Sequence, residues 1–404
     1  METPFDNAKP ILEKLHIAGF EAYYVGGAVR DHLLNRRIGD VDIATSAKPK
    51  DVQNLFEHTI DVGAEHGTII VLHNKTPYEV TTYRTESEYV DFRRPKEVSY
   101  ITSLKEDLRR RDFTINAMAM DIDCIILDYF NGKAHLSEKL IQTVGSSSER
   151  FTEDALRMLR AVRFVSQLDF TLCPETRLSI KDHVHLLEVI SVERKTIEIE
   201  KLLKGINHKS ALEIILETGM NDYLPGLEMK QDELKKLRTY NLENLKTSEE
   251  LWTIFTYCIA PRSVQTFLRK WKLPVKLIKA VEKNIEYLTV VNEQSWSDFL
   301  LYEAGIERAV TVERIRSIMT DPLNFDANVK RIKNLILELP IQHREQLVIT
   351  GHDVIQYINK QPGPWVTKAI KEVEKAIISK KIENNKSAIK EWLMRCKLDF
   401  EQNY

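Results

Sequence analysis

The 404-residue sequence lacks several features that define common classes of protein. No apolar run is long enough to span a bilayer, which argues against a membrane protein, and the opening METPFDNAKPILEKL lacks the basic-then-apolar order of an export signal. Low-complexity tracts and repeats of fixed period are absent too. Four cysteines stand far apart and outside metal-ligand spacing, so we expect free thiols in a reducing cytoplasm: Cys124, Cys173, Cys258 and Cys396.

Excess charge of one sign is also missing. The chain has 58 Lys and Arg against 60 Asp and Glu, which gives a formal net charge of −2. Overall charge therefore gives no attraction to a polyanion. A nucleic-acid partner would have to be met by a local basic surface.

What is present predicts several domains, because the chain is too long for one compact core of ordinary size. Residues 1 to about 140 mix helix-like segments such as 7–20 with strand-like ones, including two strands within 67–84 joined by a turn at 73–77. From about residue 147 onward, nearly every periodic segment is helical. We expect an α+β chain, with a mixed sheet first and an all-helical remainder after it.

The stretch AYYVGGAVRDHLLN predicts a strand that turns directly into a helix at Gly26-Gly27. Unpaired N–H groups at a helix start favour an anion, and glycine lets a ligand approach the backbone closely. Arg30, one turn later, could add a phosphate contact. The stretch is neither a P-loop nor a dinucleotide fingerprint, so a plain strand–helix turn is the alternative.

The stretch IGDVDIAT places Asp40 and Asp42 one residue apart in what reads as a buried strand. Alternate strand residues share a face, so both carboxylates would project together while Val41 points into the core. Magnesium takes one or two carboxylates plus substrate phosphate oxygens, which makes the pair a candidate Mg²⁺ site. A loop-facing pair at a strand end is the alternative. Glu79 could approach as a third carboxylate or be an edge residue.

Two later stretches combine arginines with carboxylates. LRRRDFTINAMAMD carries Arg109 to Arg111, then Asp112, and then Asn116 in a run that we expect to be helical. Arginine and carboxylate together can bind ribose and phosphate. A charged helix N-terminus is the alternative. In ERFTEDALRMLRAVRF, Thr152 is the expected N-cap of one helix. One half of that helix carries donors and acceptors suited to a base edge, unless it is an ordinary ion-paired surface: Glu153, Asp154, Arg157, Arg160 and Arg163.

In order and spacing, these motifs resemble the bacterial class II CCA-adding enzymes, which are tRNA nucleotidyltransferases. The likeness is strong over about residues 20–170 and continues more weakly through the helical remainder. It implies a DNA polymerase beta-like nucleotidyltransferase head followed by an elongated helical neck, body and tail. The implied borders are 1–140 for the head, 141–205 for the neck, 206–285 for the body and 286–404 for a tRNA-binding tail.

The resemblance also implies residue roles. Asp40 and Asp42 would be catalytic and hold Mg²⁺, while Gly27 and Arg30 would bind the triphosphate. Nucleotide binding would further involve Arg111 and Asp112 (ribose and phosphate), Asp154 and Arg157 with Glu153 nearby (the base), and Arg160 and Arg163 (the rest of the pocket). Residues 83–95 match the flexible loop needed for the final A, although ESEY departs from the usual D-G-x-Y and leaves the loop's stiffness open.

The implied reaction is template-independent addition of C, C and A to the tRNA 3′ end from CTP and ATP, with release of pyrophosphate. An A-only enzyme, a bacterial poly(A) polymerase, and a non-catalytic RNA-binding protein on an inactive head remain alternatives. Oligomeric state stays open, with a homodimer as one form. The lysine-rich stretch 366–400 predicts an amphipathic helix pair or a phosphate-contacting surface. His352-Asp353 lacks partner histidines and reads as a surface turn.

Overall fold

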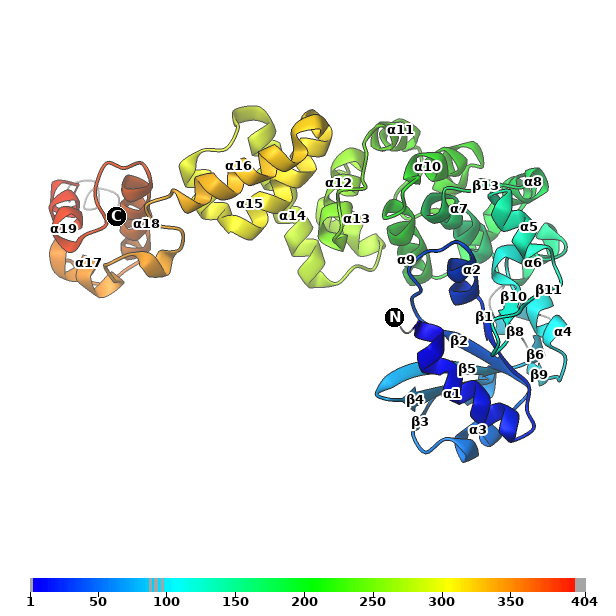
Figure 1. The fold of residues 1–404 in the computed structure, drawn as a ribbon. Helices are drawn as coiled ribbons and strands as arrows, with labels where there is room; N and C mark the ends of the chain where they lie inside the picture. Colours follow the sequence, from blue (N-terminus) through cyan, green and yellow to red (C-terminus); the bar gives the residue numbers. More distant parts are fainter. Residues whose placement is uncertain (1–2, 87–88, 91–93, 96–97, 397–404) are drawn as a thin grey trace. The chain divides into compact units, whose positions relative to one another are not determined.

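The computed structural model describes residues 3–86, 89–90, 94–95 and 98–396. The chain forms two compact units (Figure 1). The first comprises Met1–Thr239 with Arg269–Lys272, and the second comprises Tyr240–Leu268 with Leu273–Tyr404. The division into head, neck, body and tail stays a prediction.

A seven-stranded sheet with strand order β11-β10-β1-β2-β5-β4-β3 lies in the first unit. Strands β2 and β5 run parallel and the other neighbouring pairs antiparallel, which confirms the expected mixed sheet. Its strands are β1 (Ala22–Val25), β2 (Asp42–Thr45), β3 (Thr59–Gly63), β4 (Thr68–His73), β5 (Thr76–Thr82), β10 (Met118–Met120) and β11 (Ile126–Asp128).

Helices α1 (Pro4–Ile17), α2 (Gly27–Leu33) and α3 (Pro49–Leu55) accompany this sheet, with α1 packed on β1 and α3 packed on β4 and β5 (Figure 1). The expected hairpin is present: β4 and β5 join through Asn74 and Lys75, whose positive φ angles of 49° and 64° suit a tight two-residue turn. Local turn chemistry therefore sets the register of this pair.

One expected helix is wrong. The apolar run around Asn116 forms a short 3₁₀ helix, η2 (Thr114–Asn116), and then strand β10. All of residues 112–120 are buried. Burial on every side removes the polar and apolar alternation that separates a helix from a strand, so periodicity alone could not decide.

The predicted flexible loop, 83–95, is described only in part, because residues 87–88 and 91–93 lie outside the described residues. Strand β6 (Arg84–Glu86) pairs antiparallel with β9 (Val98–Tyr100), and β7 (Tyr89–Val90) pairs with β8 (Arg94–Pro95). The described backbone of the loop therefore forms two antiparallel ladders, one inside the other. The role of these residues as the flexible loop stays a prediction.

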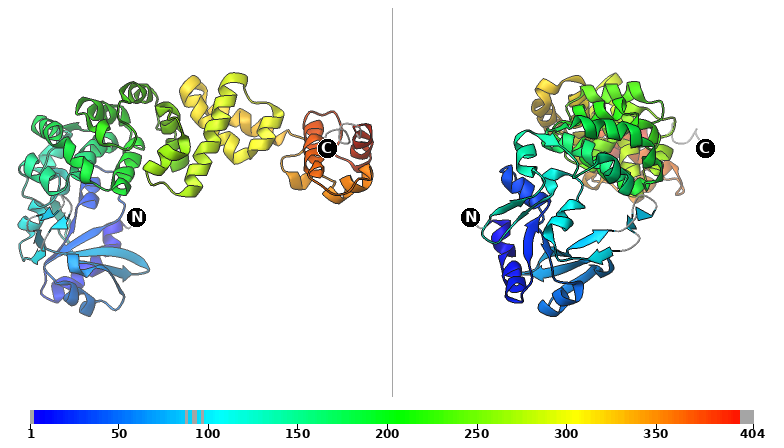
Figure 2. Two further views of the ribbon diagram at one scale, coloured as in Figure 1. Left: turned by 180° about the vertical axis from the view of Figure 1, so that it is seen from behind. Right: turned by 90° about the vertical axis from the view of Figure 1, so that its right-hand side faces the viewer.

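Helices dominate the rest of the first unit, as expected (Figure 2). Helix α7 packs against α9 and α10, and α6 packs against α8. The remaining elements are α4 (Leu104–Arg109), α5 (Gly132–Ser137), β12 (Leu140–Ile141), α6 (Ser147–Glu153), α7 (Leu156–Leu168), β13 (Thr171–Leu172), α8 (Pro174–His183), α9 (Val192–Leu203), α10 (His208–Glu217) and α11 (Gln231–Thr239).

Every regular element in the described residues of the second unit is a helix. Its helices are α12 (Ser248–Ile259), α13 (Val264–Lys270, which crosses between the two units), α14 (Val275–Gln294), α15 (Asp298–Thr320), α16 (Phe325–Leu337), α17 (Gly351–Ile358), α18 (Trp365–Ile378) and α19 (Lys386–Arg395). Helix α15 is broken at Gly305, whose φ of 70° and ψ of 165° no helix contains.

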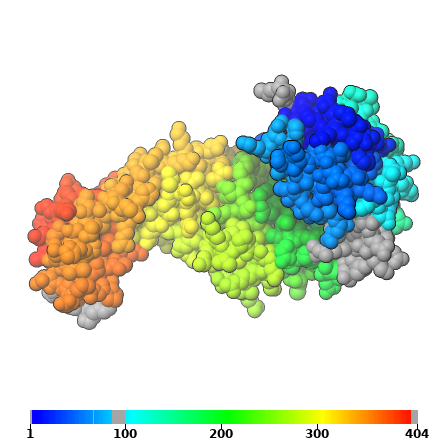
Figure 3. Space-filling model, turned by 90° about the horizontal axis from the view of Figure 1, so that it is seen from below, coloured from blue at the N-terminus to red at the C-terminus, as the bar shows by residue number. Residues whose placement is uncertain are grey.

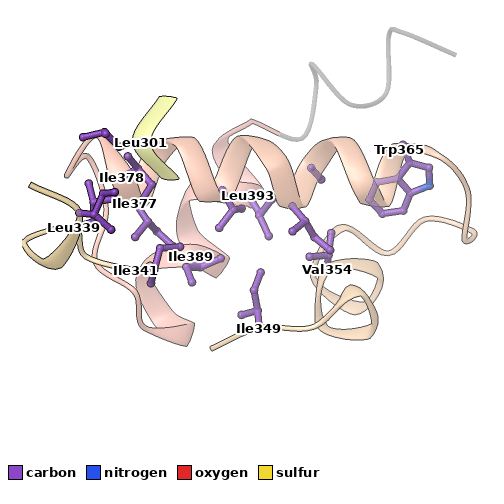
Figure 4. Close-up of a cluster of buried hydrophobic side chains, with 14 of the residues drawn as sticks. Leu301, Leu339, Ile341, Ile349, Val354, Trp365, Ile377, Ile378, Ile389 and Leu393 are labelled. Atoms are coloured by element: carbon purple, nitrogen blue, oxygen red, sulfur yellow. The ribbon is translucent and has the colours of Figure 1, made fainter. Parts of the chain in front are cut away.

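The lysine-rich C-terminal stretch does form an amphipathic helix pair. Ile377 of α18 and Ile389 and Leu393 of α19 belong to one buried apolar cluster and lie together between the helices (Figure 4). In the space-filling view, the blue N-terminal part and the orange and red C-terminal part each present a closely packed surface (Figure 3). Among the described helices, none combines the length and apolarity that crossing a bilayer requires.

Candidate active site

A cavity of about 690 Å³ lies in the first unit, lined by strands β1, β2 and β5, the β1–α2 turn and helices α7 and α9. Of the predicted site residues, the cavity brings together Gly27, Arg30, Asp42, Arg111, Asp112, Asp154, Arg157, Arg160 and Arg163. Asp40 and Glu153 are not among the residues that line it. Segments more than 130 residues apart in the sequence thus meet at one place.

The β1–α2 turn brings backbone close to charged side chains. Gly26 has φ 74° and ψ −135°, a conformation that favours glycine. A Cβ atom there would lie 3.1 Å from Arg111 Nη1 and 3.7 Å from Asp42 Oδ2. Arg30, one turn into α2, donates to Asp31 at 3.0 Å and to Asn116 Oδ1 at 2.8 Å. A side chain at Gly26 would therefore require the Arg111 guanidinium to shift by a few tenths of an ångström, and Arg30 is held in place.

The paired aspartates differ from the prediction in one respect. Strand β2 begins at Asp42, so Asp40 precedes the strand and is exposed. Asp42 pairs with Val25, the last residue of β1; because the chain leaves the sheet at Gly26, Asp40 has no strand partner there. Val41 is buried, as expected.

Glu79 is the direct neighbour of Asp42 on the parallel strand β5, and both residues line the cavity. Burial, the Glu79 carboxylate and the Asp40 carboxylate raise the pKa of Asp42 to about 6, although Arg111 opposes them. Such a gathering of like charges is unfavourable by itself. It suits a site completed by a cation.

Asp112 has hydrogen-bond partners among the other residues that line the cavity. Its Oδ2 accepts a hydrogen bond from Arg160 Nε at 2.7 Å, and its Oδ1 accepts one from Asn116 Nδ2 at 3.2 Å. Burial alone raises the pKa of Asp112, but Arg160, Arg157 and the Asn116 hydrogen bond outweigh burial and lower it to about 2. Asp112 is therefore ionised and fixed before any ligand arrives.

The predicted single helix with Thr152 as N-cap is wrong. Helix α6 begins after Ser146, whose hydroxyl accepts the Glu149 N–H, and ends at Glu153. Asp154 follows in extended backbone, and its Oδ1 accepts the Leu156 N–H at 3.1 Å at the start of α7. Asp154 thus stands at a break between two helices. No Gly or Pro marks this break, so it could not be recognised from local sequence signals.

The arginines of α7 do not form a solvated face. Arg157 and Arg163 are 8% and 6% exposed. Arg157 pairs with Glu153 and donates to the Arg110 carbonyl at 3.1 Å, and Arg163 lies 3.2 Å from Glu198 of α9. These contacts place the guanidinium groups in the cavity wall rather than in solvent.

Phe164 is the common neighbour of three of these cations. The guanidinium carbons of Arg163, Arg30 and Arg160 lie 4.3, 5.2 and 5.8 Å from its ring centroid. An aromatic ring attracts cations through its quadrupole and offers them no hydrogen bond. Phe164 therefore holds the three cations near one another without using any of their N–H groups.

Positive charge dominates the cavity. Among the described residues, nine cationic side chains line it against four acidic ones. Arg111 Nε, Arg163 Nε and Arg194 Nη1 are buried without a hydrogen-bond partner in the part of the chain that the structure describes. A nucleic-acid partner of this near-neutral chain would need a local basic surface, and the cavity provides one. Its excess of cations suits a polyanion.

Family models match three parts of the chain. The Poly A polymerase head domain matches residues 22–142, the probable RNA and SrmB-binding site of polymerase A matches 169–230, and tRNA nucleotidyltransferase domain 2 matches 243–393. A CCA-adding enzyme of Geobacillus sp. is 46% identical over 395 residues, with 98% of both chains covered. The chain belongs to the CCA-adding enzyme family.

A solved structure agrees with this membership. The CCA-adding enzyme of Bacillus stearothermophilus, crystallised in complex with CTP, is 42% identical and superposes with a TM-score of 0.93 over 100% of both chains. The Thermotoga maritima CCA-adding enzyme complexed with tRNA_CCA has a TM-score of 0.67 at 18% identity, covers 98% of this chain and 96% of its own, and shows the shared fold.

Reasoning from the sequence missed several residues of this CCA-adding enzyme fold. Arg194 of α9 donates to Asp154 Oδ2 at 2.6 Å, and Phe164 gathers the arginines, yet neither belonged to the predicted site. Arg84, Arg110 and Lys201 also line the cavity. Phe164 looked like an ordinary core residue. Arg194 lies 40 residues from its partner, so no local pattern could have connected them.

His352 and Asp353 serve the fold. Thr350 Oγ1 caps the Asp353 N–H, and Asp353 accepts from the Thr350 N–H at 2.7 Å, which closes a capping box at the start of α17. The pair therefore lies in the first turn of a helix rather than in the expected surface turn. No group of three or more His, Cys, Asp or Glu residues in the described ranges is arranged to hold a metal ion.

Proposed function

We propose that this chain adds C, C and A to the 3′ end of tRNA, using CTP and ATP and releasing pyrophosphate. The observation that carries the proposal is one cavity with carboxylates at the sheet and arginines, with Asp154, at the helices. Family membership makes tRNA the substrate class. The relative crystallised with CTP supports the nucleotide class.

The carboxylate end suits Mg²⁺. Magnesium binds through one or two carboxylates and completes its shell with substrate phosphates and water, so a group of three protein ligands is not required. Asp42 lies in the cavity, and Asp40 and Glu79 are close enough to raise its pKa. In our proposal Asp40 and Asp42 hold the ion. The bound metal would polarise the reacting phosphate and the attacking 3′ oxygen.

The arginine side orients the nucleotide. Gly27 offers backbone at the start of α2, and Arg30 and Arg111 bring cations to the triphosphate. Asp112, fixed by Arg160, is an ionised acceptor for a ribose hydroxyl. Catalysis then depends on alignment and on neutralising charge as pyrophosphate leaves, with no covalent intermediate on the protein.

The helix break selects the base. Asp154 and Arg157 present an acceptor and donors to the cavity, and a cytosine or adenine edge can pair with both. Glu153 pairs with Arg157, and Arg194 pairs with Asp154. These ion pairs fix the orientation of Arg157 and Asp154. Arg163, backed by Glu198, completes the pocket. These contacts replace a nucleic-acid template.

The four-part division belongs to the same proposal: head 1–140, neck 141–205, body 206–285 and tail 286–404. In the tail, Lys368 and Lys371 are exposed on α18, and Lys371 pairs with Glu303 at 2.7 Å. Such side chains can contact RNA phosphates without reading sequence. Reaction on tRNA would take place in the cytoplasm.

One incubation series tests the function. Transcripts ending before the CCA, after the first C and after CC are offered CTP and ATP with Mg²⁺. Growth by only the missing nucleotides supports the proposal. Growth of the CC transcript alone would indicate an A-adding enzyme, and long A tails would indicate a poly(A) polymerase. No growth in any lane would leave an inactive head and overturn the proposal.

A further inference from the structure

A second cavity, of about 510 Å³, lies beside the first in the same unit and has no assigned role. It is lined by Arg30, Asp31, Arg36, Arg37, Gln167, Leu168, Lys204, Gly205 and Ile206. Arg30 and Gln167 also line the first cavity, so the two cavities are adjacent and share these side chains. The walls come from the α2–β2 connection, the end of α7 and the α9–α10 connection.

Three cations of this second cavity, Arg36, Arg37 and Lys204, are exposed, and of these Lys204 pairs with Glu200 at 2.6 Å. Arg36 donates from Nη1 to the Gln167 carbonyl at 3.0 Å, which fixes the side chain against α7 and leaves its other N–H groups available. Within the described ranges, no carboxylate lies within ion-pair distance of Arg36 or Arg37. Asp31, the carboxylate in the lining, is already paired with Arg30 at 2.9 Å. The cavity is therefore positive without a ligand.

Its position relates it to the reacting end of the RNA. Arg36 and Arg37 lie on the same connection that ends in Asp40, and four residues of chain span at most about 14 Å. A tRNA 3′ hydroxyl at the carboxylates would therefore place the phosphates of its last nucleotides within reach of this connection if the RNA entered from the side of the second cavity. The two arginines carry planar donors suited to phosphate.

We propose that the second cavity binds a backbone phosphate near the 3′ end of the tRNA primer through Arg36 and Arg37. The inference rests on the proposed function and adds a primer subsite to it. Free pyrophosphate shares the chemistry, but the first cavity already provides nine cations for it. Arg30 is the cation that lines both cavities among the described residues, and it already donates hydrogen bonds to Asp31 and Asn116.

The test compares Arg37→Gln and the double variant Arg36→Gln/Arg37→Gln with the control Lys50→Gln. Lys50 is exposed on α3 of the same unit, so the control also loses one positive charge there. Each protein is given a transcript that ends before the CCA. We measure kcat and KM for the transcript at several salt concentrations, KM for CTP, and inhibition by added inorganic pyrophosphate.

We expect about a fivefold rise in transcript KM for Arg37→Gln and a larger rise for the double variant. The dependence of log KM on log salt should become shallower by about one unit per lost contact. KM for CTP, kcat and pyrophosphate inhibition should stay as in the control. Arg37→Gln removes no recorded contact, so its result does not depend on the Arg36–Gln167 bond.

Two outcomes overturn the proposal. Weaker pyrophosphate inhibition or a higher CTP KM, with unchanged transcript KM, would assign the second cavity to the triphosphate or its product. Kinetics equal to those of Lys50→Gln throughout would make the arginines an ordinary solvated surface. Failure of the proposed function is distinct, because the unaltered protein would then not extend the transcript.

Discussion

Two carboxylates, one in each unit, are surrounded in opposite ways. In the second unit, Glu250 accepts hydrogen bonds from the N–H groups of Lys246 and Thr247 at 2.8 and 2.9 Å and pairs with Arg314. Burial raises the pKa of Glu250, but these backbone and arginine contacts together lower it. In the first unit, Asp42 has its pKa raised to about 6 by burial, Glu79 and Asp40.

The Glu250 carboxylate stabilises the fold, whereas the Asp42 carboxylate needs a bound cation to offset its charge. Glu250 meets its partners within its own unit, so ionisation stabilises the folded state. Asp42 faces other carboxylates, so its ionisation opposes folding until a cation arrives. A candidate active site can thus be recognised as a place where ionisable side chains lack partners of opposite charge within the protein itself.

The largest expected effect is the loss of chemistry in Asp42→Ala. Without this carboxylate the metal and the attacking oxygen are not aligned, and CMP incorporation into a tRNA transcript should fall by at least about 1,000-fold. The circular dichroism spectrum should stay unchanged, because the side chain lines a cavity. Retained turnover would show that Asp42 holds no metal.

The reverse pattern is expected for Glu250→Gln. Removing one member of a buried pair leaves Arg314 poorly matched and should lower the free energy of unfolding by about 2 kcal/mol. Because the folded pKa of Glu250 is lowered, this stability is present at neutral pH and disappears as the pH falls through the folded pKa. Urea unfolding at pH 7.5 measures the loss. The choice between CTP and ATP should not change.

Asp154→Ala should shift the choice between CTP and ATP by about tenfold, since one good base contact is worth roughly 1–3 kcal/mol. Competition of the two nucleotides on a CC-ended transcript measures this shift. Alanine also removes the acceptor for the Leu156 N–H. Asp154→Asn is the matched control because its oxygen can still cap α7. If only alanine altered the preference, capping rather than base recognition would be responsible.

The smallest expected effect concerns the stability of the metal-free protein. The folded pKa of Asp42 is raised, so its favourable contribution is present at low pH and is lost as the pH rises through about 6. Asp42→Asn should therefore be about 1 kcal/mol more stable than the unaltered chain at pH 7.5. Near pH 4 the two should be alike. Thermal unfolding with a chelator present measures both, and equal stability at pH 7.5 would contradict the difference between the units.

Local signals were enough to predict much of the first unit. The strand-like composition of 67–84 and the turn-like stretch 73–77 predicted the β4–β5 hairpin, which the structure confirms. Clustering of Gly27, Arg30 and Asp42 followed from the strand–turn–helix order. The likeness of ordered motifs to a known family then joined these segments to Asp154 and Arg157, which spacing alone could not do.

What could not be predicted depends on contacts distant in the sequence. The start of β2 is set by where β1 leaves the sheet, so it fell at Asp42 rather than Asp40. The pairing of Arg160 with Asp112 spans 48 residues, and that of Arg194 with Asp154 spans 40. A helix wheel shows which residues share a face. It does not show which partner covers them.

The tight β1–α2 turn has a consequence for how the family could change over evolutionary time. Any replacement of Gly26 adds a Cβ atom 3.1 Å from Arg111 Nη1, so this guanidinium has to shift, and it requires a backbone conformation that residues with a side chain rarely adopt. Every acidic and basic group would remain in the sequence. A catalytically inactive descendant that still bound RNA could therefore arise through one added carbon. A search for missing carboxylates would not detect it.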